Sequence, residues 1–310
     1  MSRTGHTPRA LGWPAVDQPR AIDDLSVESR HLQAADGGIS LLTIVTASDA
    51  APTGAEIVLL HGMFTDRRFW LSDDGVGLAG ALARRGHRVY LAQRRGLGRD
   101  TPAPGARRGL TEQIRYDLPA LQALIAAESS RPVFWGGHSF GAFAAARAVA
   151  ETLDPGQVAG LLILACQFDL AKPMLGGWGS WLTRMAIWRW RRLPAKIAGI
   201  GPISEPPSAA LDAIDWTSSA RRQPVIRDAL GAITVPVLAL VGRGDKVDPP
   251  DGCRRFVDYM TSRDATFMIA GRTNGFAADY SHAGLVIDRA ARADVWPRIA
   301  AWIEARVPTD

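Results

Sequence analysis

The stretch "VFWGGHSFGAFAAARAV", residues 133–149, decides the fold of this chain. A bulky apolar run, typical of a buried strand, passes through small and polar residues into an alanine-rich segment typical of a helix. Gly137-His138-Ser139-Phe140-Gly141, at the junction, fits the pattern G-x-S-x-G. Small residues two positions before and after the serine let a strand and a helix approach closely across a tight turn. The stretch therefore predicts a strained turn that lifts the Ser139 hydroxyl clear of a sheet.

Short apolar runs alternate with helical patterns on both sides of this turn. The runs are "EIVLL" (56–60), "RVYLA" (88–92), "PVFW" (132–135), "GLLILAC" (160–166), "VPVLALV" (235–241) and "TFMIA" (266–270), and the helical patterns lie near 76–85, 111–128, 140–152, 251–262 and 291–306. Nearly continuous apolar runs are typical of strands buried on both faces. "LSVESRHLQ" and "GISLLTIVT" flank the turn signal "AADG" and predict an antiparallel hairpin. Together these features predict an α/β fold with a mostly parallel central sheet and helices on both faces.

The alternation divides the chain into three parts. We expect residues 1–24 to form an irregular arm, and residues 25–168 and 235–310 to form one α/β core. Residues 169–234 leave the strand–helix rhythm and are rich in tryptophan, arginine and proline. A structureless loop of that length is improbable in a compact domain, so this segment is interpreted as an inserted helical cap.

Composition excludes several classes of protein. The formal net charge of the 310-residue chain is +5, but its basic residues are scattered, which argues against nucleic-acid binding. Cys166 and Cys253 make no disulfide framework and fit a reducing compartment. The start of the chain lacks the apolar core of a signal peptide, and no window is long enough for a membrane span. We therefore expect a cytoplasmic protein, although the arginine-rich, acid-poor start leaves a transit peptide open.

A serine hydroxyl needs a base and an orienting acid, which should follow in the order Ser, Asp or Glu, His. "GRGDKVDPP" places Asp245 at the carboxyl end of an expected strand, where ligands meet in open α/β sheets. Asp248 is its rival, and Asp169, after an earlier strand, is a weaker third candidate. Of six histidines, only His282, in "DYSHAGLVID", follows Asp245. We expect His282 Nε2 to take the serine proton while Asp245 holds the other ring nitrogen.

The negative charge that develops during acyl transfer needs two hydrogen-bond donors. "IVLLHGMFTDRRFW" places His61-Gly62-Met63-Phe64 directly after an expected central strand. Gly62 lets the backbone turn sharply, so the Met63 amide can point to the same place as the amide of Phe140. These two amides are the expected oxyanion hole. The side chain of His61 is expected only to hold the loop by a hydrogen bond.

Taken together, "HGMF", "GHSFG", "GRGD" and "SHAG" resemble the α/β-hydrolase superfamily in order and position, from about residue 26 to the end. "LARRGHRVYLAQRRGLGRD", which ends in an R-G-x-G turn at 95–98, and "HGMFTDRRFW" are most similar to acid-lipase-like and serine-hydrolase-type bacterial members. The resemblance implies an esterase, a lipase or a peptidase. The loop reads H-G-x where many short-chain esterases have H-G-G-G, which weakly favours medium or longer acyl groups.

The cap carries "GGWGSWLTRMAIWRWRRLP" at 176–194. Trp181, Met185 and Trp188 fall on one face of a helix, with Arg184, Arg191 and Arg192 around another edge. This face could simply pack on its own domain. It could also line an acyl pocket, in which case Phe64, Trp181, Met185 and Trp188 are the expected substrate-binding residues. A third possibility is that it rests on an anionic lipid interface as a peripheral membrane contact.

These residues predict a serine hydrolase that cleaves a small-molecule ester or a lipid through an acyl-enzyme. No metal or organic cofactor is expected, because the chain has neither zinc-ligand spacing nor a phosphate-cradling glycine loop. An amide or peptide hydrolase with the same triad, and a non-catalytic binder of apolar ligands, are the alternatives. Lyase chemistry would need a cap lysine near the serine, Lys172 or Lys196. Acyl length, alcohol and oligomeric state stay open.

Overall fold

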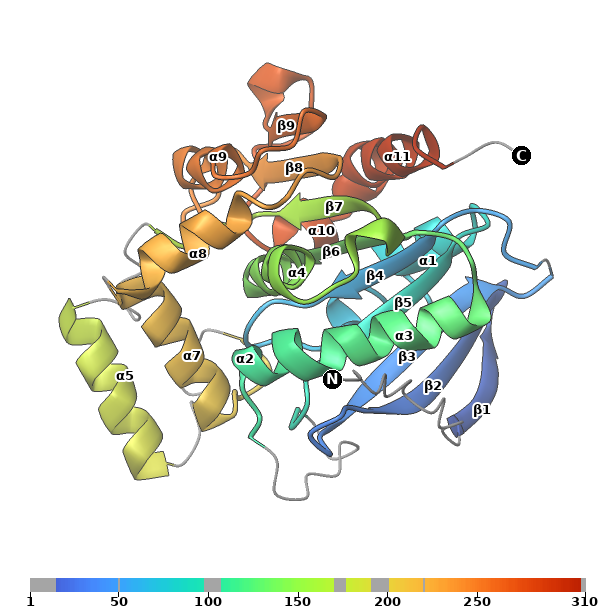
Figure 1. The fold of residues 1–310 in the computed structure, drawn as a ribbon. Helices are drawn as coiled ribbons and strands as arrows, with labels where there is room; N and C mark the ends of the chain where they lie inside the picture. The colour runs from blue at the N-terminus through green and yellow to red at the C-terminus, as the bar shows by residue number, and fades with distance from the viewer. Residues whose placement is uncertain are drawn as a thin grey trace, which may run out of the picture.

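A computed structural model describes residues 15–49, 51–97, 107–169, 177–190, 201–219 and 221–307. Outside these ranges lie residues 1–14 of the expected arm, Gly98, Lys172, Arg191, Arg192 and Lys196. Within them the chain builds a nine-stranded sheet in the order β1-β2-β3-β5-β4-β6-β7-β8-β9 (Figure 1). The strands are β1 Ala15–Ile22, β2 Leu25–Gln33, β3 Ile39–Ala47, β4 Glu56–Leu60, β5 Arg88–Gln93, β6 Val133–His138, β7 Val158–Leu164, β8 Val237–Gly242 and β9 Ala265–Ala270.

The sheet is parallel from β5 to β9 in its spatial order, and β1, β2 and β3 add an antiparallel edge. The predicted hairpin is the pair β2 and β3. The helices are α1 Leu78–Ala83, α2 Leu110–Glu112, α3 Leu118–Glu128, α4 Phe140–Glu151, α5 Gly177–Trp190, α7 Pro207–Ser218, α8 Arg222–Leu230, α9 Pro250–Asp258, α10 Gly284–Ile287 and α11 Ala291–Glu304. The predicted fold class, a mostly parallel sheet with helices on both faces, is confirmed.

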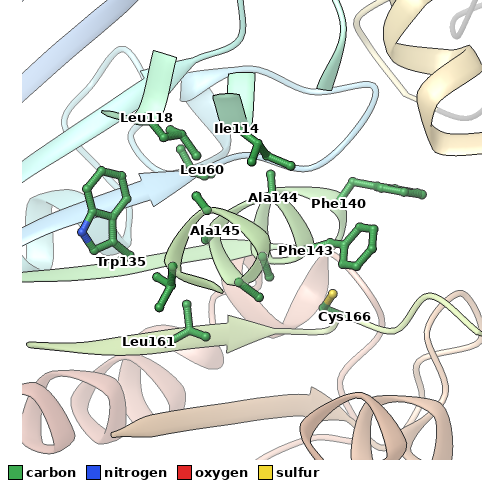
Figure 2. Packing of buried hydrophobic residues seen from close by; sticks show 14 of the residues in the cluster. Leu60, Ile114, Leu118, Trp135, Phe140, Phe143, Ala144, Ala145, Leu161 and Cys166 are labelled. Carbon is green, nitrogen blue, oxygen red and sulfur yellow. The ribbon is translucent and has the colours of Figure 1, made fainter. Parts of the chain in front are cut away.

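The core lies in two layers, one on each face of the sheet. Ile57 and Leu59 of β4 pack with α1, α10 and α11, whereas Val58 and Leu60 pack with α3, α4 and α9. Successive side chains of a strand point to opposite faces, so an uninterrupted apolar run serves both layers. Around α4 the labelled side chains of the second layer gather closely, with Trp135 among them (Figure 2). The alanines of α4 let this helix approach the sheet.

Residues 15–22 do not fit the expectation of an irregular arm, because they form β1 at the edge of the sheet. The strand pairs antiparallel with β2, with register irregularities between Ala15 and Asp17 and between Asp17 and Arg20. An edge strand tolerates Pro19, whose nitrogen has no hydrogen to donate. The polar, proline-containing sequence of this segment carries no strand periodicity, so it is the backbone pairing with β2 that makes it a strand.

We call residues 169–234 the cap segment. They lie between β7 and β8, and their described parts carry helices α5, α7 and α8. Helix α7 packs on α2 and α8, while α5 lies along the outer side of α7 (Figure 1). The role of this segment as a lid over a site stays a prediction.

In the described part of the chain, every helix is too short or too polar to cross a lipid bilayer.

Candidate active site

The turn between β6 and α4 holds Ser139 in a strained backbone conformation, with φ 55° and ψ −128°. Left-handed φ values are costly for a residue with a Cβ and persist where the surrounding structure enforces them. Here the Ser139 amide donates to Leu164 O at 2.9 Å, which ties the turn to β7. A Cβ on Gly141 would collide with Leu60 O, so the helix can start this close to the sheet only with glycine there. Ser139 sits at the amino end of α4, as the motif predicts.

Asp245 and His282 meet on the two loops that follow β8 and β9. His282 Nδ1 donates to Asp245 Oδ2 at 2.8 Å, and the Asp245 side chain is fully buried. Asp245 Oδ1 accepts from the amides of Val247 and Asp248, both at 2.8 Å, which fixes the carboxylate plane. A carboxylate can only accept, so the proton of a neutral His282 lies on Nδ1 and its Nε2 carries the lone pair.

Neither of the other two candidates for the orienting acid, Asp248 and Asp169, has its carboxylate on His282. Asp248 supports Asp245 through its backbone amide. Asp169 accepts from the Tyr259 hydroxyl at 2.6 Å and lies 3.8 Å from Arg255 Nε. The structure therefore brings Asp245, and not Asp169, to the histidine.

His138, next to the serine, reaches across to the loop of the base. Its Nε2 donates to the backbone oxygen of His282 at 2.9 Å, because a carbonyl oxygen can only accept. The two imidazole rings lie 4.4 Å apart between centroids. On the other side, the His138 ring lies 4.6 Å from that of Phe69. His138 thus links the turn of Ser139 to the loop of His282, a role that sequence reasoning missed.

The loop after β4 passes directly against the serine turn. A Cβ on Gly62 would lie 3.2 Å from both Ser139 Cβ and His138 O. These contacts would be tighter than ordinary van der Waals contacts, so glycine eases the close approach of this loop, which continues into Met63, to the serine turn. The amide of Phe140, at the first position of α4, lies at the positive end of that helix. The two expected donors of the oxyanion hole therefore belong to segments in contact with each other.

A buried ion pair that the sequence did not reveal supports this loop. Arg94 Nη1 donates to His61 O at 3.3 Å and to Gly62 O at 3.1 Å. Arg94 Nη2 forms an ion pair with Glu205 of the cap segment, and both side chains are buried. Glu205 Oε1 also accepts from the Phe64 amide at 2.6 Å. The cap segment therefore holds the loop through a charged side chain.

Backbone contacts reinforce this link. The Ile203 amide donates to Phe64 O at 3.1 Å, and Phe64 adopts φ 64°. Because the Phe64 amide is engaged by Glu205, Met63 is the remaining candidate for the second donor. The Phe64 side chain is half-buried and packs on the apolar layer that contains Phe140.

His61 serves the loop and not proton transfer. Its Nδ1 donates to Gly62 O at 2.9 Å, and its Nε2 accepts from the Arg94 amide at 3.4 Å. Burial, and then the positive charge of Arg94, lower the pKa of His61 to about 3. The ring is therefore neutral near neutral pH, in agreement with the structural role expected from the sequence.

The expected pocket face of the cap points elsewhere. Trp181, Met185 and Trp188 are exposed, while Thr183 and Ile187 form the buried side of α5. Periodicity predicted an amphipathic helix, but it could not say which side faces the protein. The core-packing interpretation therefore does not describe these three side chains, and their part in an acyl pocket stays a prediction.

Two of these groups are of the kind that nucleophilic acyl transfer uses: a serine on a strained turn, and a histidine whose Nδ1 is held by a buried carboxylate. The two oxyanion-hole amides stay a prediction. Within the described residues, no three His, Cys, Asp or Glu side chains gather as metal ligands would.

Known proteins resemble this chain in sequence and in structure. Residues 51–222, more than half of the chain, match the family model described as serine aminopeptidase, S33. A poly(3-hydroxyalkanoate) polymerase subunit PhaC of Haloarcula marismortui is 35% identical over 77 residues, which cover 25% of this chain. The chain spans only 14% of the length of that relative.

Solved structures share the fold over most of the chain. A malate-bound thermophilic esterase from Thermogutta terrifontis covers 90% of this chain and 99% of its own, with 20% identity and a TM-score of 0.63. A monoacylglycerol lipase from Paleococcus ferrophilus covers 82% of this chain and 96% of its own, with 17% identity and a TM-score of 0.57.

Proposed function

The chain belongs to the serine aminopeptidase S33 family of α/β hydrolases, and from this premise we propose that it cleaves carboxylic esters through an acyl-enzyme on Ser139. The observation that carries the proposal is the 2.8 Å hydrogen bond between His282 Nδ1 and the buried Asp245. A histidine held in this way presents an unprotonated Nε2 to a nucleophile. The strained conformation of Ser139 supports the choice of nucleophile.

The proposed reaction has two halves. His282 Nε2 takes the proton of the Ser139 hydroxyl as the oxygen attacks the ester carbonyl, and the amides of Met63 and Phe140 stabilise the resulting oxyanion. The tetrahedral intermediate collapses, the C–O bond to the alcohol breaks, and His282 returns the proton to the leaving alcohol. Water then attacks the acyl-enzyme as His282 takes its proton, the acyl C–O bond to Ser139 breaks, and His282 returns the proton to the Ser139 oxygen as the acid leaves.

An amide or peptide hydrolase is the second candidate, because the family description itself names aminopeptidases. An aminopeptidase binds a free amino group, which favours a carboxylate in the site. The rates on a p-nitrophenyl ester and a matched p-nitroanilide would separate the two.

The proposal is tested with a Ser139→Ala variant and a panel of p-nitrophenyl esters of increasing acyl length. We expect a loss of kcat of about 10⁴-fold or more, with the folded state retained by circular dichroism. A fluorophosphonate should label the wild type at Ser139 and leave the variant unlabelled. Hydrolysis that survives in Ser139→Ala at the wild-type rate would refute the assignment of the nucleophile.

A further inference from the structure

Helix α5 carries a large apolar face that is turned to solvent. The large apolar side chains of this face are Trp178, Trp181, Leu182, Met185 and Trp188. Trp178 is 85% exposed and Trp188 is 75% exposed. Residues at these spacings share one side of a helix, and Thr183 and Ile187 occupy the opposite, buried side. The rings of Trp178 and Trp181 also touch edge to face, 6.4 Å apart between centroids.

The charged side chains of α5 itself are of one sign. Arg184 and Arg189 of α5 are exposed. Residues 170–204 contain six lysines and arginines and no aspartate or glutamate. Exposed tryptophans beside arginines suit the boundary between lipid headgroups and acyl chains, where each ring buries its apolar body and each guanidinium meets a phosphate. A second copy of the chain would bring the same positive charges against themselves.

The face also has a structural connection to the site. Helix α5 packs on α7 at the outer edge of the molecule (Figure 1). The segment that leads into α7 holds the loop of Met63 through Ile203 and Glu205. A surface bound to α5 would therefore lie on the same cap segment that contacts the proposed oxyanion hole.

We propose that the exposed face of α5 docks the protein on an anionic lipid surface. The inference goes beyond the proposed ester hydrolysis and does not depend on it, since docking needs neither Ser139 nor turnover. If both hold, lipid esters at that surface are the substrate class of the enzyme.

The test is co-sedimentation of the full chain, as Ser139→Ala to keep lipids intact, with vesicles of phosphatidylcholine alone or mixed with phosphatidylglycerol. We expect binding to the mixed vesicles that weakens as salt is added. Arg184→Gln with Arg189→Gln should weaken binding by about fivefold per arginine. Trp178→Ser with Trp188→Ser should weaken it by about tenfold or more.

Matched controls separate the face from general effects of charge and apolar surface. Arg263→Gln with Arg272→Gln removes two exposed arginines outside the cap segment, and Val225→Ser removes an exposed apolar side chain of α8. Both should bind the mixed vesicles like the parent protein. The proposal is overturned if the parent protein does not sediment with the mixed vesicles, if it binds both vesicle types equally, or if the α5 variants bind as well as the controls.

A last outcome assigns the face to another occupant. If sedimentation velocity shows a dimer that the tryptophan variant abolishes, and no vesicle binding occurs, a second copy covers α5 and the lipid proposal is wrong. Failure of docking would leave the fluorophosphonate labelling of Ser139 unaffected, so the two proposals fail separately.

Discussion

Glu205 accepts a hydrogen bond of 2.6 Å from the backbone amide of Phe64, which lies far away in the sequence. The contact joins the cap segment to the loop that carries the candidate oxyanion donor Met63. Arg94 completes it, because the same guanidinium binds Glu205 and the backbone oxygens of His61 and Gly62. The loop on both sides of Met63 is therefore held by a carboxylate that is supplied from outside the α/β core.

Glu205→Gln tests this dependence. Glutamine keeps the size and an accepting oxygen but leaves Arg94 buried without a counter-charge. We expect kcat on p-nitrophenyl esters to fall by about 10–100-fold with little change in KM, because the donors act mainly on the transition state. Binding of a boronic-acid transition-state analogue should weaken in parallel.

A merely structural role of Glu205 would show differently. Losing one partner of a buried pair can cost about 3 kcal/mol of unfolding free energy, so activity is measured well below the unfolding midpoint of the variant. Glu304→Gln, which breaks an exposed ion pair with Arg85, is the matched control and should keep both activity and stability. If KM rises and stability falls while kcat stays unchanged, the positioning role is contradicted.

Asp245→Asn tests the orienting acid. The asparagine can donate to Nδ1 and so favours the tautomer of His282 that lacks a free Nε2. We expect kcat/KM to fall by about 10⁴-fold, with a matching fall in the rate of fluorophosphonate labelling. Asp169→Asn, at the rejected position beside Tyr259, should change either rate less than about tenfold. If both variants lose kcat/KM and labelling rate equally, Asp169 and not only Asp245 would have to act on His282.

His138→Phe tests the link between the serine turn and the loop of the base. Phenylalanine keeps an aromatic ring against His282 but removes the donor to its backbone oxygen. We expect kcat to fall by about tenfold, because small displacements of a catalytic group are costly. His138→Gln, which keeps a donor, should recover part of the loss. An unchanged pH profile and rate in His138→Phe would show that this hydrogen bond does not position His282.

The sequence predicts the core and the order of the candidate triad because both depend on local signals. An apolar run, a glycine pair around Ser139, and a carboxylate or histidine after a strand can each be recognised within a few residues. The 2.8 Å contact of His282 with Asp245 joins two such signals at neighbouring strand ends. Of the two neighbouring carboxylates, the position nearer the strand end favours Asp245 over Asp248, and the hydrogen bond of His282 goes to Asp245.

Tertiary contacts decide what the sequence left open. No pattern marks Glu205 or Arg94, since their role exists only where the cap segment meets the loop after β4. Periodicity predicts that Trp181 lies on an apolar face of α5, but it cannot say whether that face turns to the protein or to solvent. In the structure the opposite side, with Thr183 and Ile187, is the buried one. Strand β1 was not predicted because its polar, proline-containing sequence carries no strand periodicity, whereas its backbone pairs with β2.

The buried, neutral His61 predicts how stability changes with pH. Its pKa is 6.5 as a free side chain and about 3 in the fold, with burial as the main cause. Between these values the unfolded chain binds more protons than the native protein, so stability falls as pH falls from about 6.5 toward 3. One such group contributes up to about 1.4 kcal/mol per pH unit.

His61→Gln removes this titration while glutamine can still bond the loop. The free energy of unfolding is measured by urea unfolding at a series of pH values from about 7 to 4.5. We expect it to fall less steeply with falling pH in the variant than in the wild type, by a slope that corresponds to at most about one bound proton. Burial also lowers the pKa of His87, which is present in both proteins and cancels in the comparison. Identical slopes would mean that His61 takes up its proton in the folded state, and the loop it anchors would then have to open in acid.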